Sequence, residues 1–252
     1  MIMFRKWEKM SKERVDDLQL NGKKIIQNED YFCFGIDSVL LANFVESKSN
    51  KNIIVDLCSG SGVISVIVSQ KKKYSKIYAV ELQEEMYDLL KRNIDMNSLQ
   101  DKIYPVKDDI KNFSLKDKVD IVVVNPPYKK IGTGIENENL VKSIARNEVK
   151  CTLEDVFLCA SRLLKQKGKL YLVHKPQRLS DLISVARKYN LEPKKMQFVY
   201  LNIKSAPSIV LVEYSYFGGN ELKVLPPLIE YDDKNNYTKQ IYDIYGSEKN
   251  GK

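Results

Sequence analysis

The segment "NPPY", from Asn125 to Tyr128, combines groups that are suited to holding an amino group. It follows "VDIVVV", an apolar run that is typical of a buried strand. The Asn125 side-chain oxygen and the Pro126 carbonyl can accept both hydrogens of an amine, and Pro127 stiffens the turn because its ring fixes φ. The Tyr128 ring offers a flat surface for stacking. We therefore predict that these four residues form a catalytic site.

A glycine-rich turn, "VDLCSGSG" at residues 55–62, follows an earlier apolar run and opens a helix. Glycines in such a turn let the backbone approach a ligand, and the amide groups at the helix start point toward it. The dinucleotide pattern G-x-G-x-x-G would need a third glycine at position 65, which is Ser65, so a ligand that needs only the turn is favoured over a nicotinamide dinucleotide. The candidate ligand-binding residues are Asp56, Ser59, Gly60 and Gly62.

Acidic residues end the next two apolar runs. Glu81 lies 19 residues after Gly62, where a carboxylate can accept hydrogen bonds from both ribose hydroxyls of a nucleoside. Asp108 and Asp109 follow the third run, and a carboxylate there can accept from an adenine amino group. Open parallel sheets bind ligands at the carboxyl ends of their strands. These positions therefore predict a nucleoside site that includes Glu81, Leu82, Asp109 and Ile110.

A sheet of strands alternating with helices must position these residues. Apolar runs predict parallel strands at residues 52–57, 76–82, 102–106, 119–125 and 168–175. Helical spacing predicts helices at 63–70, 84–97, 153–165 and 179–189. Two further runs, at 194–203 and 208–216, predict an antiparallel hairpin at the sheet edge. The predicted fold is α/β and Rossmann-like, with a seven-stranded, mostly parallel sheet, a terminal antiparallel hairpin and helices on both faces.

Length and composition indicate one main domain. A chain of 252 residues with 43% hydrophobic content can bury a full core. We expect an N-terminal extension at residues 1–50 with a short helix near the nucleoside site, a main domain at 51–230 and a polar tail at 231–252. No apolar run is long enough to span a membrane, and the charged start lacks a secretory pattern, so we expect a cytoplasmic protein.

Charge and metal-ligating residues limit the function classes. Lys and Arg outnumber Asp and Glu by 41 to 33, which favours a polyanionic partner, although lysines that only solvate the surface would give the same count. The four cysteines contain no CxxC pair, and His174 is the only histidine. We therefore expect neither a metal site nor a disulfide framework, and we interpret His174 as a packing or surface residue.

Four motifs together resemble a known enzyme class. D-L-C-S-G-S-G, A-V-E-L, D-D-I and N-P-P-Y are similar to motifs I to IV of S-adenosylmethionine-dependent methyltransferases that modify amino groups. Segments 25–44, 145–156 and 205–231 resemble the bacterial tRNA(Val) adenine-37 N6-methyltransferase family, over most of the chain. One departure lies at residues 58–62, where relatives usually carry Gly-Thr-Gly-Thr-Gly. Serine can replace threonine as a donor there, and Cys58 is small.

The resemblance implies a class I methyltransferase fold, S-adenosylmethionine as the cofactor without a metal, and tRNA as the partner through its anticodon loop. It implies that Asn125 and Pro126 direct the amine lone pair at the sulfonium methyl, without a strong general base. Tyr128 would stack on the target base. No obligatory protein partner is expected, and the flanking phosphates would contact the basic residues Lys129, Lys130, Lys142 and Arg146.

Three alternatives remain open. A protein glutamine N5-methyltransferase presents the same amide chemistry to N-P-P-Y, but such enzymes carry a helical domain before the core, and only about fifty residues precede the first predicted strand. An rRNA guanine N2-methyltransferase is the second alternative. The third is a non-catalytic RNA-binding assembly factor, against which the intact Asn125 and the glycine-rich turn argue.

Overall fold

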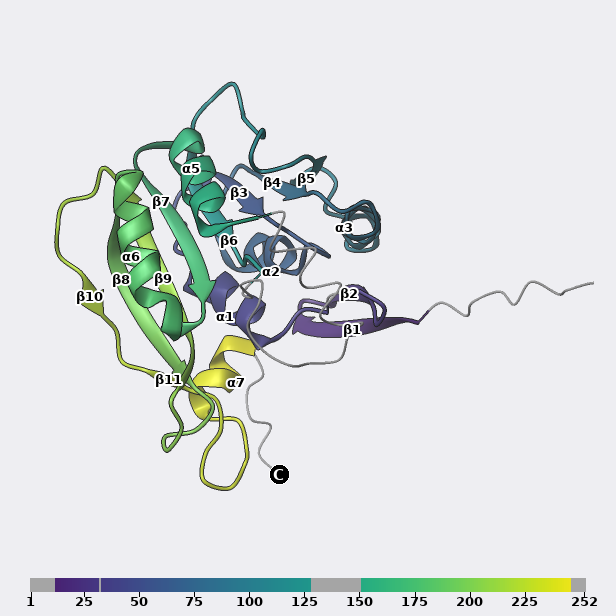
Figure 1. Cartoon of the computed structure of the whole chain (residues 1–252). Coiled ribbons are helices and arrows are strands. Elements are labelled where there is room, and N and C mark those ends of the chain that lie inside the picture. The colour runs from purple at the N-terminus through teal and green to yellow at the C-terminus, as the bar shows by residue number, and fades with distance from the viewer. Residues whose placement is uncertain (1–11, 32, 128–150, 246–252) are drawn as a thin grey trace, which may run out of the picture.

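The computed structural model describes residues 12–31, 33–127 and 151–245. A nine-stranded sheet forms its centre, and helices cover both faces (Figure 1). Five strands run parallel in the order β5-β4-β3-β6-β7. Their bounds are β3 Ile53–Leu57, β4 Lys76–Glu81, β5 Ile103–Lys107, β6 Val119–Val124 and β7 Leu164–His174. The carboxyl ends of these five strands therefore lie at one edge of the sheet.

The second half of the sheet differs in detail from the prediction. β9 (Pro207–Tyr216) runs antiparallel between β7 and β8 (Leu191–Tyr200), so it lies inside the sheet. β8 is not an edge strand either, because β10 (Lys223–Val224) and β11 (Leu228–Ile229) pair with it. The expected count of seven strands is therefore too low by these two strands, which have two residues each and no readable alternation. The α/β class and the mostly parallel order are confirmed.

Helices pack on both faces because both faces of the strands are apolar. In β6, Ile121 and Val123 belong to one buried cluster, whereas Val122 and Val124 belong to the other. The first cluster includes residues of α1 (Ile36–Phe44), α2 (Val63–Lys71), α3 (Glu84–Met96) and α7 (Lys239–Tyr245). The second includes residues of α5 (Leu153–Leu163) and α6 (Leu179–Lys188), and the single-turn helix η1 (Pro176–Arg178) leads into α6.

A hairpin that was not predicted precedes the first parallel strand. β1 (Glu13–Leu20) and β2 (Lys23–Asn28) pair antiparallel through a turn at Asn21 and Gly22, both at positive φ. Asn-Gly is the preferred pair for such a turn, so the signal was present in the sequence. The hairpin docks on α3 through Asn93, whose amide accepts from Ile26 N at 2.7 Å and donates to Ile26 O at 3.1 Å.

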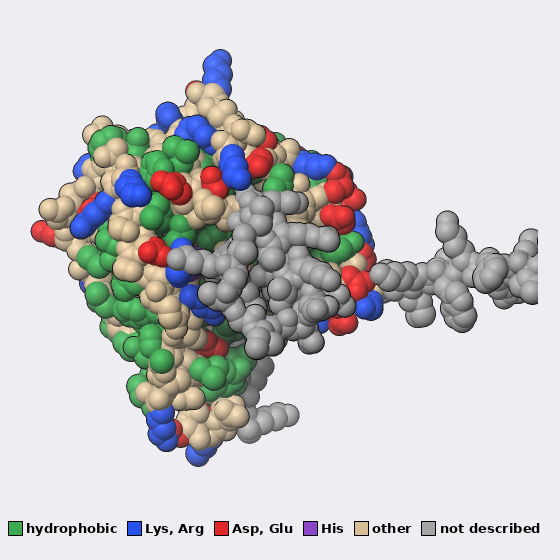
Figure 2. Space-filling model, viewed as in Figure 1, with side chains coloured by type: hydrophobic (Ala, Val, Ile, Leu, Met, Phe, Trp, Pro, Cys, Tyr) green, Lys and Arg blue, Asp and Glu red, His purple; other side chains and the backbone are tan. Residues whose placement is uncertain are grey.

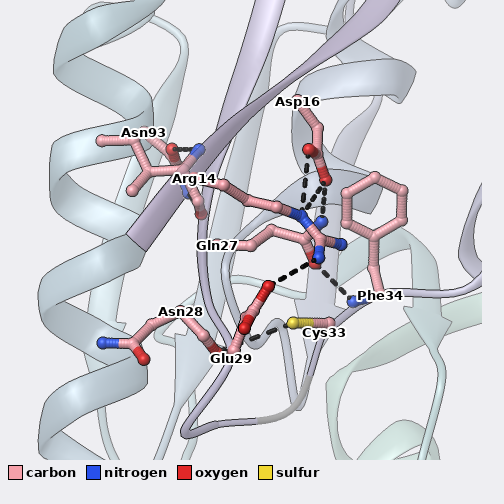
Figure 3. Close-up of polar contacts among 9 residues, drawn as sticks. Arg14, Asp16, Gln27, Asn28, Glu29, Cys33, Phe34 and Asn93 are labelled. Atoms are coloured by element: carbon pink, nitrogen blue, oxygen red, sulfur yellow. Dashed lines mark hydrogen bonds and ion pairs between the residues drawn. The ribbon is translucent and has the colours of Figure 1, made fainter. Parts of the chain in front are cut away.

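Figure 3 shows polar contacts within the hairpin and between the hairpin and the segment that precedes α1. The Gln27 side chain donates to Asp16 and accepts from the backbone N of Phe34 at 2.8 Å. At the other end of the chain, α7 was not predicted, and its Ile241 is fully buried. The division of the chain at residues 50 and 230 stays a prediction. Among the residues described, no helix is long and apolar enough to cross a membrane.

Candidate active site

A cavity of about 360 Å³ opens at the carboxyl ends of the parallel strands. Its walls come from the end of β4, from the segments that follow the five parallel strands, from α1, α2 and α3, and from the segments that precede α1 and α5. The lining residues are Phe34, Ser38, Cys58, Ser59, Gly60, Ser61, Val63, Ile64, Val80, Glu81, Leu82, Gln83, Met86, Asp109, Ile110, Asn125, Pro126, Pro127, Cys151 and Lys175. The structure thus brings together residues from all the sequence motifs.

The glycine-rich turn forms one wall through three residues at positive φ. Cys58 has φ 55°, Gly60 55° and Gly62 84°. Glycine is favoured at position 62, because any other residue would be strained at this φ and its Cβ would lie 2.5 Å from Leu90 Cδ1. Cys58 occupies the left-handed region with a side chain, at a cost of about 1 to 2 kcal/mol. The turn is fixed further by Ser59 N, which donates to Val80 O at 3.0 Å.

Glu81 joins this turn to the next strand end. Its carboxylate accepts from Gly60 N at 2.9 Å and from Gln83 N at 2.8 Å. The side chain lines the cavity although the residue is only 5% exposed, and this burial raises the pKa of the carboxyl while the backbone donors lower it. Glu81 is thus a buried acceptor held by two backbone amides at the cavity wall, and its ribose-binding role stays a prediction.

Asp56, by contrast, does not line the cavity. Its Oδ2 atom accepts from Ser65 Oγ at 2.7 Å and from Ser65 N at 3.2 Å, so the carboxylate supports the start of α2. The residue is 1% exposed, and burial raises its pKa to about 7. The Asp56 carboxylate therefore contacts helix α2, and no part of Asp56 lines the cavity in which the ligand is predicted to bind. Ser59 lines the cavity, and its buried Oγ atom has no hydrogen-bond partner among the residues described.

The third strand end contributes Asp109 and Ile110 to the lining, as predicted. Asp109 Oδ1 accepts from Lys111 N at 2.9 Å, which orients the carboxylate. Ile110 O accepts from Arg162 Nη2 at 2.7 Å, so α5 holds this wall. Asp108 does not line the cavity, and its Oδ1 accepts from Asp109 N.

Asn125 directly follows β6, and Asn125, Pro126 and Pro127 all line the cavity. The Asn125 side-chain nitrogen donates to Ser38 Oγ at 2.9 Å. Ser38 lies on α1 and is buried. The remaining predicted residues of this region, Tyr128, Lys129, Lys130, Lys142 and Arg146, lie outside the described residues.

Several lining residues were not predicted from the sequence. Phe34 and Ser38 belong to a segment that the family resemblance included, but no motif pointed to their side chains. Cys151 precedes α5, and Lys175 follows β7. His174, next to Lys175, is buried, and its Nδ1 accepts from Lys175 N at 2.8 Å. Burial lowers the pKa of His174 to about 4, so its imidazole is neutral at pH 7.

The basic side chains do not gather into one continuous patch on the face seen in Figure 2, where Lys and Arg lie among Asp and Glu. Several lysines are paired with acidic residues, as Lys165 is with Asp120 at 2.9 Å and Lys195 with Glu46 at 2.6 Å. In the described part of the chain, no three His, Cys, Asp or Glu residues form a metal-binding group.

Comparison with known proteins gives three kinds of match. A family model described as the TRM5/TYW2 methyltransferase domain matches residues 41–136. A tRNA1(Val) (adenine(37)-N6)-methyltransferase from Flavobacterium johnsoniae is 24% identical over 228 residues, covering 90% of this chain and 96% of the relative. The protein of the same name from Pasteurella multocida is 26% identical, covering 81% of this chain and 84% of the relative.

Solved structures share the fold. A predicted O-methyltransferase from Agrobacterium tumefaciens has a TM-score of 0.67 at 20% identity, covering 84% of this chain and 96% of that one. TYW2 from M. jannaschii, in complex with AdoMet, has a TM-score of 0.54 at 16% identity, covering 85% and 89%. The Rossmann-like class I methyltransferase fold is thus confirmed. The motif resemblance is confirmed as well: over most of its length, this chain is similar to proteins named tRNA1(Val) (adenine(37)-N6)-methyltransferase.

Proposed function

We propose that this protein is an enzyme that transfers a methyl group from S-adenosylmethionine to the exocyclic N6 of an adenine in tRNA. One observation carries the proposal: Asn125, Pro126 and Pro127 line the same cavity as Gly60 and Glu81. Groups suited to an amine and groups suited to a nucleoside therefore open onto one space. The relatives are named for adenine 37 of tRNA1(Val), and we propose the same target in the anticodon loop.

The cavity fits a nucleoside cofactor. Glu81 presents a buried carboxylate for ribose hydroxyls, and the Asp109 carboxylate is available to an adenine amino group at the adjacent strand end. The buried Ser59 hydroxyl has no hydrogen-bond partner among the residues described, and a polar ligand would supply one. When bound, S-adenosylmethionine supplies an electrophilic methyl group on a sulfonium sulfur.

The chain's own contribution to the reaction is orientation of the amine. The Asn125 Oδ1 atom and the Pro126 carbonyl accept the two N–H hydrogens, so the nitrogen lone pair is directed toward the methyl group. Ser38 assists because it accepts from the Asn125 nitrogen and thereby fixes which way the amide faces. Neither acceptor takes the proton, which is lost to solvent once the nitrogen carries a positive charge.

The proposed substrate also suits the entrance of the cavity. An adenine in an anticodon loop leaves its stack at low cost, and Phe34 and Pro127 offer apolar surface for its ring. Lys175 lines the cavity, and we propose that it contacts a flanking phosphate together with Lys129, Lys130 and Arg146. Tyr128 remains the proposed stacking residue. We further propose that the enzyme works in the cytoplasm, where tRNA is its partner.

Methylation of defined transcripts tests this function. Purified protein, S-adenosylmethionine and a tRNA(Val) transcript should yield N6-methyladenosine, detected by mass spectrometry of the digested nucleosides. A transcript with guanine in place of adenine 37 is the matched control and should remain unmodified. Methylation of a glutamine-containing peptide or of rRNA guanine, without methylation of tRNA, would support one of the alternative enzymes instead.

A further inference from the structure

Two cysteines that are far apart in the sequence meet in the wall of the cavity. The Sγ atoms of Cys58 and Cys151 lie 3.9 Å apart, although 93 positions separate them along the chain. Both residues are half-buried, and both line the cavity. The other two cysteines differ, since Cys159 is buried in α5 and the Cys33 sulfur contacts Asn28 O at 3.6 Å. Cys58 and Cys151 are thus neighbouring thiols that are alike in burial and in their place in the cavity wall.

We propose that Cys58 and Cys151 form a redox modification site, which a peroxide converts reversibly into an intramolecular disulfide that weakens S-adenosylmethionine binding. The inference rests on the proposed cofactor, but not on the proposed tRNA substrate. The four cysteines predict no disulfide framework, and a single reversible bond is consistent with that prediction. Reducing compartments allow such transient disulfides.

The two thiols have different roles in the proposed reaction. Contact with Cys151, followed by burial, raises the pKa of the Cys58 thiol well above its ordinary value, so Cys58 stays protonated. Cys151 directly precedes Thr152, the N-cap of α5, and its Sγ lies 3.9 Å from that of Cys58. Because the Cys58 thiol is held protonated, we assign the first attack on the peroxide to Cys151.

The chemistry balances in two steps. The Cys151 thiolate attacks one peroxide oxygen, so that an S–O bond forms, the O–O bond breaks and hydroxide leaves to become water. The sulfur loses two electrons and the peroxide gains them. The Cys58 thiol then attacks the oxidised sulfur: the S–S bond forms, the S–O bond breaks, and water leaves with the Cys58 proton. A dithiol reductant reverses the bond by two thiol–disulfide exchanges.

Formation of the bond must change the cavity. A disulfide holds its sulfurs about 2 Å apart, so the two walls must approach or rotate. The Cys58 side is constrained, because its backbone is at φ 55° and the next residue, Ser59, donates to Val80 O. The same turn presents Gly60 N to Glu81 at 2.9 Å. A crosslink to Cys58 therefore distorts the wall on which the cofactor is proposed to bind.

Peptide mapping and calorimetry on the full chain test the proposal. After treatment with hydrogen peroxide, mass spectrometry without reductant should find a peptide that links Cys58 to Cys151. Affinity for S-adenosylmethionine should fall roughly tenfold or more and should return after dithiothreitol. Cys151→Ser, compared with its own reduced form, should lose both responses, and the matched Cys33→Ser should keep both.

Three results would overturn the inference: no linked peptide, a link that involves Cys33 or Cys159 instead, or oxidised protein that binds as tightly as reduced protein. Reduced protein that fails to bind S-adenosylmethionine would overturn the cofactor assignment, and with it the effect on binding. The linked peptide is detected without any cofactor, so the two failures are distinguishable.

Discussion

The side-chain nitrogen of Asn125 donates a hydrogen bond of 2.9 Å to the hydroxyl oxygen of Ser38. The bond joins the end of β6 to α1, 87 positions away in the sequence, and it orients the amide on which the proposed mechanism depends. Ser38→Ala should lower the single-turnover rate about 3- to 10-fold, because one net hydrogen bond contributes about 0.5 to 1.5 kcal/mol. Cofactor affinity should stay nearly constant. The measurement is rapid-quench methylation of tRNA.

The matched control for this variant is Ser69→Ala. Ser69 is also a buried helical serine, but its hydroxyl donates to Val66 O within α2, and it does not line the cavity. Equal rate losses in the two variants would show that Ser38 acts only through stability.

Asn125→Ala removes the side-chain acceptor itself. The single-turnover rate should fall by about two orders of magnitude or more, while calorimetry should find cofactor binding nearly unchanged, because the acceptor acts mainly as methyl transfer begins. Thermal unfolding serves as the fold check, since Asn125 also ends a buried strand. A folded variant that methylates tRNA at the parent rate would refute the amine-holding mechanism.

Glu81→Ala should weaken S-adenosylmethionine binding by about 1.5 to 3 kcal/mol, because charge-assisted bonds to two hydroxyls are lost. Part of this loss will come from the turn, since Glu81 also holds Gly60 N. Glu85→Ala, at an exposed position on α3, is the control. Calorimetry measures the affinity of both variants for S-adenosylmethionine. Equal affinities would show that Glu81 does not bind the cofactor.

Asp56 should make stability depend on pH. Burial raises its folded-state pKa to about 7, so between about pH 4 and 7 the folded protein binds more protons than the unfolded chain. Unfolding free energy should therefore fall as pH rises through this window. As pH rises from about 5 to 7, the unfolding free energy of the parent should fall by roughly 1 to 2 kcal/mol more than that of Asp56→Asn. Urea titrations at each pH measure both. Asp101→Asn, at an exposed position, should behave like the parent. Parallel curves for parent and Asp56→Asn would contradict the assignment.

Two glycines separate the cost of backbone conformation from the cost of crowding. Both Gly22 and Gly62 have positive φ, but a Cβ at Gly22 meets nothing within 4 Å, whereas one at Gly62 lies 2.5 Å from Leu90 Cδ1. Gly22→Ala should cost about 1 to 2 kcal/mol of unfolding free energy, and Gly62→Ala about 1 to 3 kcal/mol more. Urea denaturation measures both. Equal costs would mean that Leu90 moves aside without penalty.

The parallel strands were predictable because helices cover both faces of the sheet. Strands that are buried on both faces appear in the sequence as nearly continuous Val and Ile runs, as in β6. Their carboxyl ends then placed Gly60, Glu81, Asp109 and Asn125 at one edge, and all four line the cavity. The two-residue strands β10 and β11 were not predictable, because two residues have no periodicity. The β1–β2 turn was readable from its Asn-Gly pair but was overlooked.

The side chains that support the site were harder to predict than those at the strand ends. Ser38 and Phe34 reach the cavity through packing of α1 and its preceding segment, which no local pattern encodes. Asp56 was assigned to the ligand, yet Ser65 takes up its carboxylate. The contact between Cys58 and Cys151 joins residues 93 positions apart, and it forms only when the sheet strands and helices between them have folded. Tertiary contacts between distant segments are what local sequence patterns omit.

Asn93 connects the N-terminal hairpin to the glycine-rich turn. Its side chain is fully buried; besides both backbone groups of Ile26, its amide nitrogen contacts Ser61 O at 2.9 Å. If the hairpin detaches, Asn93 loses both partners on Ile26, and the side chain that also holds Ser61 O is no longer fixed, so hairpin and turn should open as a single cooperative unit. A ligand that holds the turn should then slow amide hydrogen exchange in β2, although β2 lines no part of the cavity.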